Sequence, residues 1–127
     1  MNEIVEEWIN KAEADFATAE REFAVTERTN FDAVCLHAQQ CIEKLMKGLL
    51  IANGVTPPKI HDLAHLNRLL LPVCTDWNWP LEELHFLSRA AVEFRYPGEI
   101  ADLEQASRAL DICKRIRARL KELPGLK

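Results

Sequence analysis

The chain has 127 residues, 48% hydrophobic and 28% charged, with 16 basic and 20 acidic side chains and a net charge of −4. This length and composition predict a single globular domain over residues 1–127 and exclude a disordered tail. The acidic balance argues against a protein that coats nucleic acid or an anionic membrane by bulk attraction, while a local basic patch stays compatible with it.

Neither membrane insertion nor export is indicated by the sequence. No apolar run is long enough for a transmembrane helix, and the acidic start of the chain lacks the basic-then-apolar order of a signal peptide. The four cysteines, separated by 6, 33 and 39 positions, match no paired metal or redox spacing. Cys35, Cys41 and Cys113 fall within helical patterns, so we interpret them as small buried residues of a reduced, cytoplasmic protein.

Apolar residues recur at helical spacing in five segments, and no stretch alternates with the period of a strand. We expect helices over residues 2–24, 31–53, 61–71, 81–94 and 101–123. The second segment carries apolar residues well beyond a single stripe, which predicts a central helix with several neighbours. Three long helices joined to two short ones predict an all-α, up-and-down bundle.

Capping signals support these boundaries. They are Thr29 or Asn30 before the second helix, Gly54 after it, Asn78 before the fourth and an Asp102–Gln105 capping box at the fifth. Pro97 disfavours a helical Tyr96 and therefore interrupts the chain between the fourth and fifth helices.

Polar residues interrupt the apolar pattern of the second helix. Helical spacing places His37, Gln40, Lys44 and Lys47 on one flank, and Gln39 with Glu43 on the other. Glu43 and Lys47 form an i,i+4 pair in the favourable order. The set is either a solvated helix face or the polar rim of a cleft in which Lys44 and Lys47 are available to phosphate.

Two short motifs carry further alternatives. Arg95 and Tyr96, forced out of the helix by Pro97, either pack at a helix end or present a cation and an aromatic face to a base or phosphate. His61 and His65 have the spacing of shared metal ligands, but two ligands do not make a site, and Asp62 between them also suits a first helical turn.

The last helix has a basic C-terminal half, with Arg108, Arg115 and Arg119 on one flank of the apolar stripe and Lys114, Arg117 and Lys121 on the other. The helix dipole alone accounts for cations near a C-terminus. Contact with RNA is the sharper interpretation. The chain contains no nucleophile elbow, P-loop or dinucleotide-binding glycine motif.

Taken in order, several motifs resemble those of a known family. They are Trp8 with Ala12–Phe16, then Ala38–Leu50, then Pro57–Leu63, and finally Arg95–Pro97. Together they resemble the HEPN domain (higher eukaryotes and prokaryotes nucleotide-binding). The resemblance implies a helical bundle, usually homodimeric, from the prokaryotic cytoplasm. It also implies that small members are often encoded beside a minimal nucleotidyltransferase, as a toxin–antitoxin-like pair.

Several branches of this family are metal-independent ribonucleases with an Arg-x(4–6)-His motif brought together across a dimer. Counted from Arg95, Arg89 or Arg28, no position at that spacing holds a histidine. We therefore expect no catalytic residue of this type, no metal and no cofactor. The predicted function is a non-catalytic component that binds a nucleotide or a partner protein; the alternatives are a ribonuclease toxin with a non-standard site and a plain dimeric interaction bundle.

The resemblance implies a set of ligand- or partner-binding candidates at the matched positions. These are Gln40, Glu43, Lys44, Lys47, His61, Asp62, Arg95 and Tyr96. Lys44 and Arg95 would hold phosphate, and Tyr96 would stack on a base or pack on a partner subunit. Glu43 and Gln40 would equally suit a hydrogen-bond network between helices.

Overall fold

The computed structural model describes residues 2–94 and 96–127. Within them it contains five α-helices: α1 (Glu3–Phe23), α2 (Phe31–Ala52), α3 (Leu63–Leu70), α4 (Leu81–Glu93) and α5 (Leu103–Glu122). The predicted all-α bundle is confirmed. Each helix lies inside its predicted range and is shorter by one to three residues, partly because capping residues such as Asp62 and Asp102 stand outside the helix that they cap.

The helix ends follow local capping chemistry, with one exception. The Asn30 side chain accepts a hydrogen bond from the Ala33 amide at 3.0 Å, and Asp102 and Gln105 form the predicted reciprocal capping box. The expectation that Asn78 caps α4 is wrong. Pro80 occupies the N-cap position without a side-chain acceptor, and Asn78 lies two residues too early to reach the first free amides.

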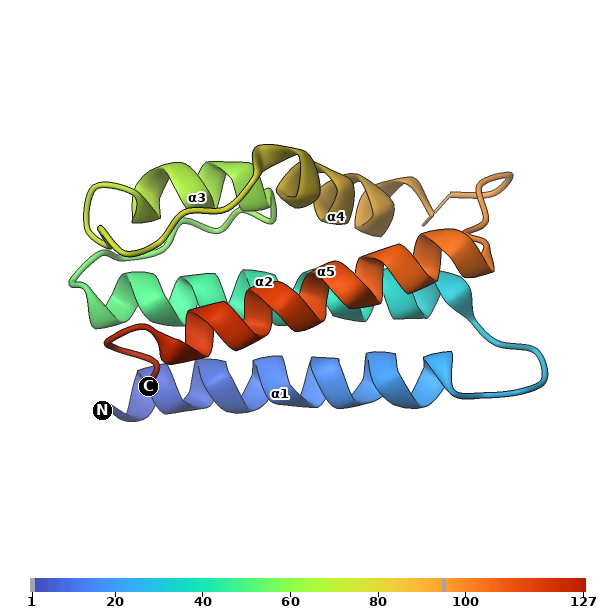
Figure 1. Ribbon diagram of the computed structural model, residues 1–127, viewed down its shortest axis with the longest axis horizontal. Helices are drawn as coiled ribbons and strands as arrows, with labels where there is room; N and C mark the ends of the chain where they lie inside the picture. Colours follow the sequence, from blue (N-terminus) through green and yellow to red (C-terminus); the bar gives the residue numbers. More distant parts are fainter. Residues whose placement is uncertain (1, 95) are drawn as a thin grey trace.

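Figure 1 shows how the helices are arranged around α2. α1 and α2 run antiparallel, α5 crosses in front of them, and α3 and α4 follow one another along the opposite side of the bundle. α2 contacts each of the other four helices, which confirms that it is the central helix. Its surplus of apolar residues is therefore needed to face several neighbours at once.

α2 contributes more buried side chains to the core than any other helix, including the completely buried Ile42, Leu45, Met46 and Leu49. Burying an aliphatic side chain of this size contributes roughly 1.5–3 kcal/mol. Gly48 lets α1 approach closely, because a Cβ atom there would meet the Cβ of Trp8 at 3.2 Å. α1 and α2 thus form a tightly packed pair.

All four cysteines are free and buried, and burial raises the pKa of the Cys35 thiol to about 12. A thiol of this kind is unreactive at neutral pH. Over the described part of the chain, no helix combines the length and the apolar character needed to cross a membrane.

Candidate functional site

A cavity of about 390 Å³ lies between α2, the segment that precedes α3, and α4. Its polar lining comes from Gln39 and Gln40 of α2, from His61 and Asp62 before α3, and from His85, Ser88, Arg89 and Glu93 of α4. Three of the predicted candidates, Gln40, His61 and Asp62, are thus brought together at one place. Ala91 and Val92 of α4 supply an apolar wall.

A hydrogen-bond network beneath the cavity centres on Glu43, of which only 4% is exposed. Both carboxylate oxygens lie 3.0 Å from Nδ1 of His61. Gln39 donates to Glu43 Oε1 and to the main-chain carbonyl of His61, both at 2.9 Å. His61 is therefore held through its ring and through its backbone. Gln40 donates to Gln39 at 2.8 Å and to Glu43 Oε1 at 3.4 Å, as in the alternative of a hydrogen-bond network that includes Glu43 and Gln40.

Lys47 completes the network from below. Its ammonium donates to Glu43 Oε2 at 3.0 Å, and only 6% of the residue is exposed. Burial raises the pKa of Glu43, but hydrogen bonds from Gln39, His61 and Lys47 outweigh that effect and bring the pKa below its ordinary value. The carboxylate is accordingly ionised at neutral pH and only accepts hydrogen bonds.

The two lysines do not lie where a phosphate-binding rim requires them. Lys47 stands with Glu43 rather than with Gln40 and Lys44, and it is buried. Lys44 pairs with Asp15 of α1, which also contacts His37 Nδ1 at 2.7 Å. The interpretation in which both ammonium groups are available to phosphate is therefore wrong, because both are paired with carboxylates. Each lysine compensates a buried carboxylate that would otherwise be costly to leave unpaired.

Tyr96 does not extend this site. Arg95 lies outside the described residues. Tyr96 is 64% exposed. The described lining of the cavity includes neither Tyr96 nor Lys44 and Lys47. The shared pocket expected from Tyr96 and the α2 lysines is therefore absent from the described part of the chain.

Sequence reasoning missed the contribution of α4. His85, Ser88, Arg89 and Val92 recur at steps of three and four, so they share one face of α4 and turn towards the cavity. Ser88 Oγ accepts a hydrogen bond from the Leu63 amide at 3.0 Å, which fixes the start of α3 against α4. The helical spacing of His85, Ser88 and Arg89 can be recognised in the sequence. The spacing does not indicate which other helix these residues face.

Asp62 has a structural role at the rim, since its side chain caps α3 by accepting from the Ala64 amide at 3.2 Å. His61 and His65 have the spacing of shared metal ligands, but no metal site was expected from these two residues alone. Among the described residues, no group of three or more histidine, cysteine, aspartate or glutamate side chains is placed to hold a metal ion.

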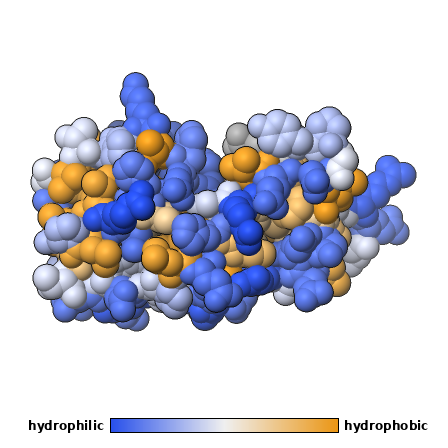
Figure 2. Space-filling view, turned by 90° about the horizontal axis from the view of Figure 1, so that it is seen from above, coloured by the Kyte–Doolittle hydropathy of each residue, from blue (hydrophilic) through white to orange (hydrophobic). Residues whose placement is uncertain are grey.

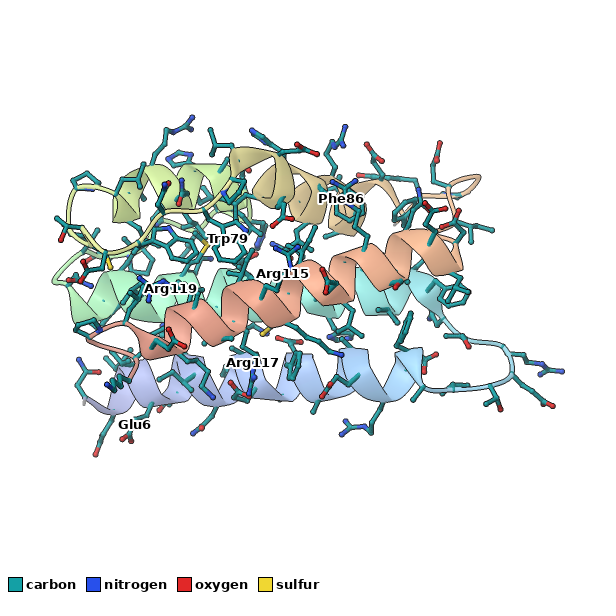
Figure 3. All side chains as sticks on the ribbon, viewed as in Figure 1. Glu6, Trp79, Phe86, Arg115, Arg117 and Arg119 are labelled. Carbon is teal, nitrogen blue, oxygen red and sulfur yellow. The ribbon has the colours of Figure 1, made fainter. Side chains whose placement is uncertain are left out.

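The arginines in the basic half of α5 are paired within the fold. Figure 3 labels Arg115, Arg117 and Arg119 along this helix. Arg117 donates to Glu13 of α1 at 2.6 Å and lies over the Phe16 ring. Arg115 donates to both carboxylate oxygens of Glu83, at 2.7 and 3.0 Å. These contacts stabilise the packing of α5 and leave the expected RNA-binding surface without free cations at these positions.

The structure is that of a small all-α domain with a cavity, partly lined by polar side chains, beside the central helix α2. The model of the HEPN domain family matches residues 5–123. The chain belongs to the HEPN domain family, as its motifs predicted.

Two solved structures share the fold. ST0689, an archaeal HEPN homologue, is 23% identical, with 95% of this chain and 98% of that chain covered and a TM-score of 0.67. TT1696 from Thermus thermophilus is 22% identical, with 93% and 96% covered and a TM-score of 0.73. At such identities the likeness concerns the fold. The search among curated proteins found no match.

Proposed function

We propose that this HEPN chain is a non-catalytic, cytoplasmic module that binds a nucleotide in the cavity between α2 and α4. The observation that carries the proposal is the meeting of Arg89, His61 and His85 on one cavity that also has an apolar wall. Arg89 offers a planar fork of donors suited to phosphate oxygens, and Val92 offers apolar surface to a base. The volume of about 390 Å³ falls within the range of roughly 300–1,000 Å³ of small-molecule sites.

Thermal unfolding with ATP, GTP and a short RNA tests this function. A ligand that binds only the folded state raises the Tm by mass action. At a ligand concentration one hundred times its Kd, the free energy of unfolding increases by about 2.7 kcal/mol. We expect Arg89→Ala to lose the rise and Arg21→Ala, an exposed arginine at the far end of α1, to keep it. The absence of any rise with all three ligands would contradict nucleotide binding.

The proposal includes a homodimer. Val92 at the end of α4, Tyr96 and Ile100 in the following turn, and Leu103 at the start of α5 are all exposed apolar side chains. Figure 2, which looks onto the α3 and α4 side, shows apolar surface emerging between hydrophilic side chains. Clustered exposed apolar groups favour a protein interface. Light scattering should show a dimer that Ile100→Asp converts to a monomer; a monomeric wild type at micromolar concentration would contradict this part.

The proposal also includes a partner, a minimal nucleotidyltransferase that forms a toxin–antitoxin-like pair with this chain. Its support is membership of the HEPN family. The neighbouring reading frame on the chromosome provides the test. A nucleotidyltransferase encoded there that co-purifies with this chain is the expected result, whereas an unrelated neighbour that does not bind would count against the pair.

A ribonuclease with a non-standard site is the second candidate function. The observation that favours it is the imidazole of His61, held by a buried carboxylate on the cavity that Arg89 also lines. An imidazole oriented in this way suits proton transfer. Incubation with total RNA decides between the two: decay that requires both His61 and Arg89 would replace the non-catalytic function, and stable RNA would remove this candidate.

A further inference from the structure

We propose that the α2–α4 cavity binds a phosphate-bearing ligand together with one proton, which is taken up by His61. The inference rests on the proposed nucleotide-binding function and specifies how the same site recognises phosphate. It follows from the hydrogen bonds that fix the tautomer of one imidazole, and it makes binding stronger at mildly acidic pH than at alkaline pH.

The first step concerns the two nitrogens of His61. Nδ1 lies 3.0 Å from both carboxylate oxygens of Glu43. An ionised carboxylate has no hydrogen to donate, so the hydrogen between them belongs to Nδ1. A neutral imidazole carries a single N–H, which leaves Nε2 as an acceptor. The side chain of His61 is 76% exposed, so Nε2 remains accessible at the cavity.

The second step concerns the phosphate. The oxygens of a fully ionised phosphate only accept hydrogen bonds, and two acceptors do not bind one another. Nε2 contacts a phosphate oxygen only when it carries a hydrogen, that is, when His61 is an imidazolium with both nitrogens donating. A phosphate placed between Nε2 and the guanidinium of Arg89 therefore brings one proton with it, and the proton stays on Nε2.

The third step concerns the support beneath the ring. Glu43 is ionised because hydrogen bonds from Gln39, His61 and Lys47 lower its pKa despite burial. Its charge is balanced by Lys47 at 3.0 Å, so the buried pair is neutral overall. Protonation of His61 then adds one net positive charge to the cavity edge, next to a carboxylate that can stabilise it.

Other charged groups also face the cavity. Asp62 before α3 and Glu93 of α4 are acidic, while His85 and Arg89 of α4 are basic. The two carboxylates repel an anion, which makes an additional positive charge at His61 more valuable to a phosphate ligand. Among the described residues, no carboxylate is hydrogen-bonded to His85, so nothing fixes its tautomer. His65 of α3 is exposed and does not belong to the described lining of the cavity, and it therefore serves as the control.

The experiment is calorimetric titration with AMP at pH 7 in two buffers of different ionisation enthalpy, which counts the protons taken up per ligand. The titration of the AMP phosphate contributes equally to every variant, so differences between variants report on the protein. We expect wild type and the control His65→Gln to take up more protons than His61→Gln, by roughly half a proton or more. His85→Gln is measured alongside them, because His85 also lines the cavity. The glutamine of His61→Gln also has an N–H group that can donate to Glu43, so we expect this variant to remain folded. Urea unfolding checks that its free energy of unfolding is close to that of wild type.

The same variants give a second measurement. At pH 6, His61→Gln should bind AMP about tenfold more weakly than wild type, and the gap should close by pH 8 because the neutral imidazole contributes no donor. Adenosine, which lacks the phosphate, should show no such difference.

The outcomes separate the inference from the function beneath it. Binding of AMP with equal proton uptake in wild type and His61→Gln would overturn the inference and leave nucleotide binding intact. A loss of uptake in His85→Gln instead of His61→Gln would overturn it as well. No binding of AMP at millimolar concentration would overturn both the inference and the proposed function.

Discussion

The outer face of α5 and the face between α2 and α4 are both rich in charge, yet they use it differently. On α5, arginines pair with carboxylates of α1 and α4 and lie over aromatic rings, as Arg117 does over Phe16. Between α2 and α4, buried charges instead support an imidazole at a cavity. Charge that is paired across a helix contact stabilises packing, whereas the buried pair of Glu43 and Lys47 orients His61, a side chain that lines the cavity.

The two faces also differ in the cost of their charges. The pair of Arg117 and Glu13 keeps about a quarter of each side chain exposed, so water still solvates it. The pair of Lys47 and Glu43 has lost nearly all of its hydration. Replacement of such a buried pair by apolar residues is often neutral or stabilising in proteins. We therefore connect its presence here to the positioning of His61.

Lys47→Met should have the largest effect on stability, because it leaves the Glu43 carboxylate buried without its cation. Removal of one partner of a buried pair costs about 3–5 kcal/mol. Urea unfolding at pH 7 measures the loss. The double variant Glu43→Leu with Lys47→Met removes both charges and should recover most of it; if the double variant is no more stable than Lys47→Met, the pair does not behave as a buried ion pair.

Acid should expose the contribution of Glu43. Its folded pKa is lowered, so its stabilisation is complete above the pKa of an unfolded glutamate, about 4.3, and is lost as the pH falls through the lower folded value. We expect the free energy of unfolding to fall more steeply between pH 5 and pH 3 for wild type than for Glu43→Gln. Parallel curves would show that Glu43 is not the group responsible.

Arg117→Met should cost about 1 kcal/mol, since the pair is partly solvated and the methionine keeps contact with Phe16. Burial raises the pKa of Glu13, and hydrogen bonds from Arg117 and Lys121 lower it further than burial raises it; Lys121, at 3.0 Å, remains as a partner in the variant. Nucleotide binding should stay unchanged. A variant that keeps its stability but loses a ligand-induced Tm rise would break the distinction between the two faces.

Arg108→Ala should have the smallest effect, below about 1 kcal/mol, because its contact with Glu82 is exposed and 3.3 Å long. The same contact should weaken with added salt. Chemical unfolding at low and high salt measures both effects. A loss of several kcal/mol would mean that the position of Arg108 over the Phe86 ring matters more than its ion pair.

The fold followed closely from local patterns in the sequence. The spacing of apolar residues and caps such as Asn30 and Asp102 depend only on neighbours a few residues away in the sequence. The helices predicted from them were confirmed. Glu43 and Lys47 were also identified as a pair. Spacing along the sequence does not show which residue will be the partner across the bundle. Lys44 pairs with Asp15, which is 29 residues away, and Arg89 lines the same cavity as His61 because α4 packs against α2.

Calorimetric titration of wild type and Arg89→Met with AMP tests the central claim most directly. The account predicts saturable one-to-one binding by wild type and binding at least about tenfold weaker for Arg89→Met, since one charge-assisted contact to phosphate is lost. Arg21→Met should bind like wild type. Equal affinity of wild type and Arg89→Met, or no saturable binding by either, would contradict the assignment of the cavity as a nucleotide site.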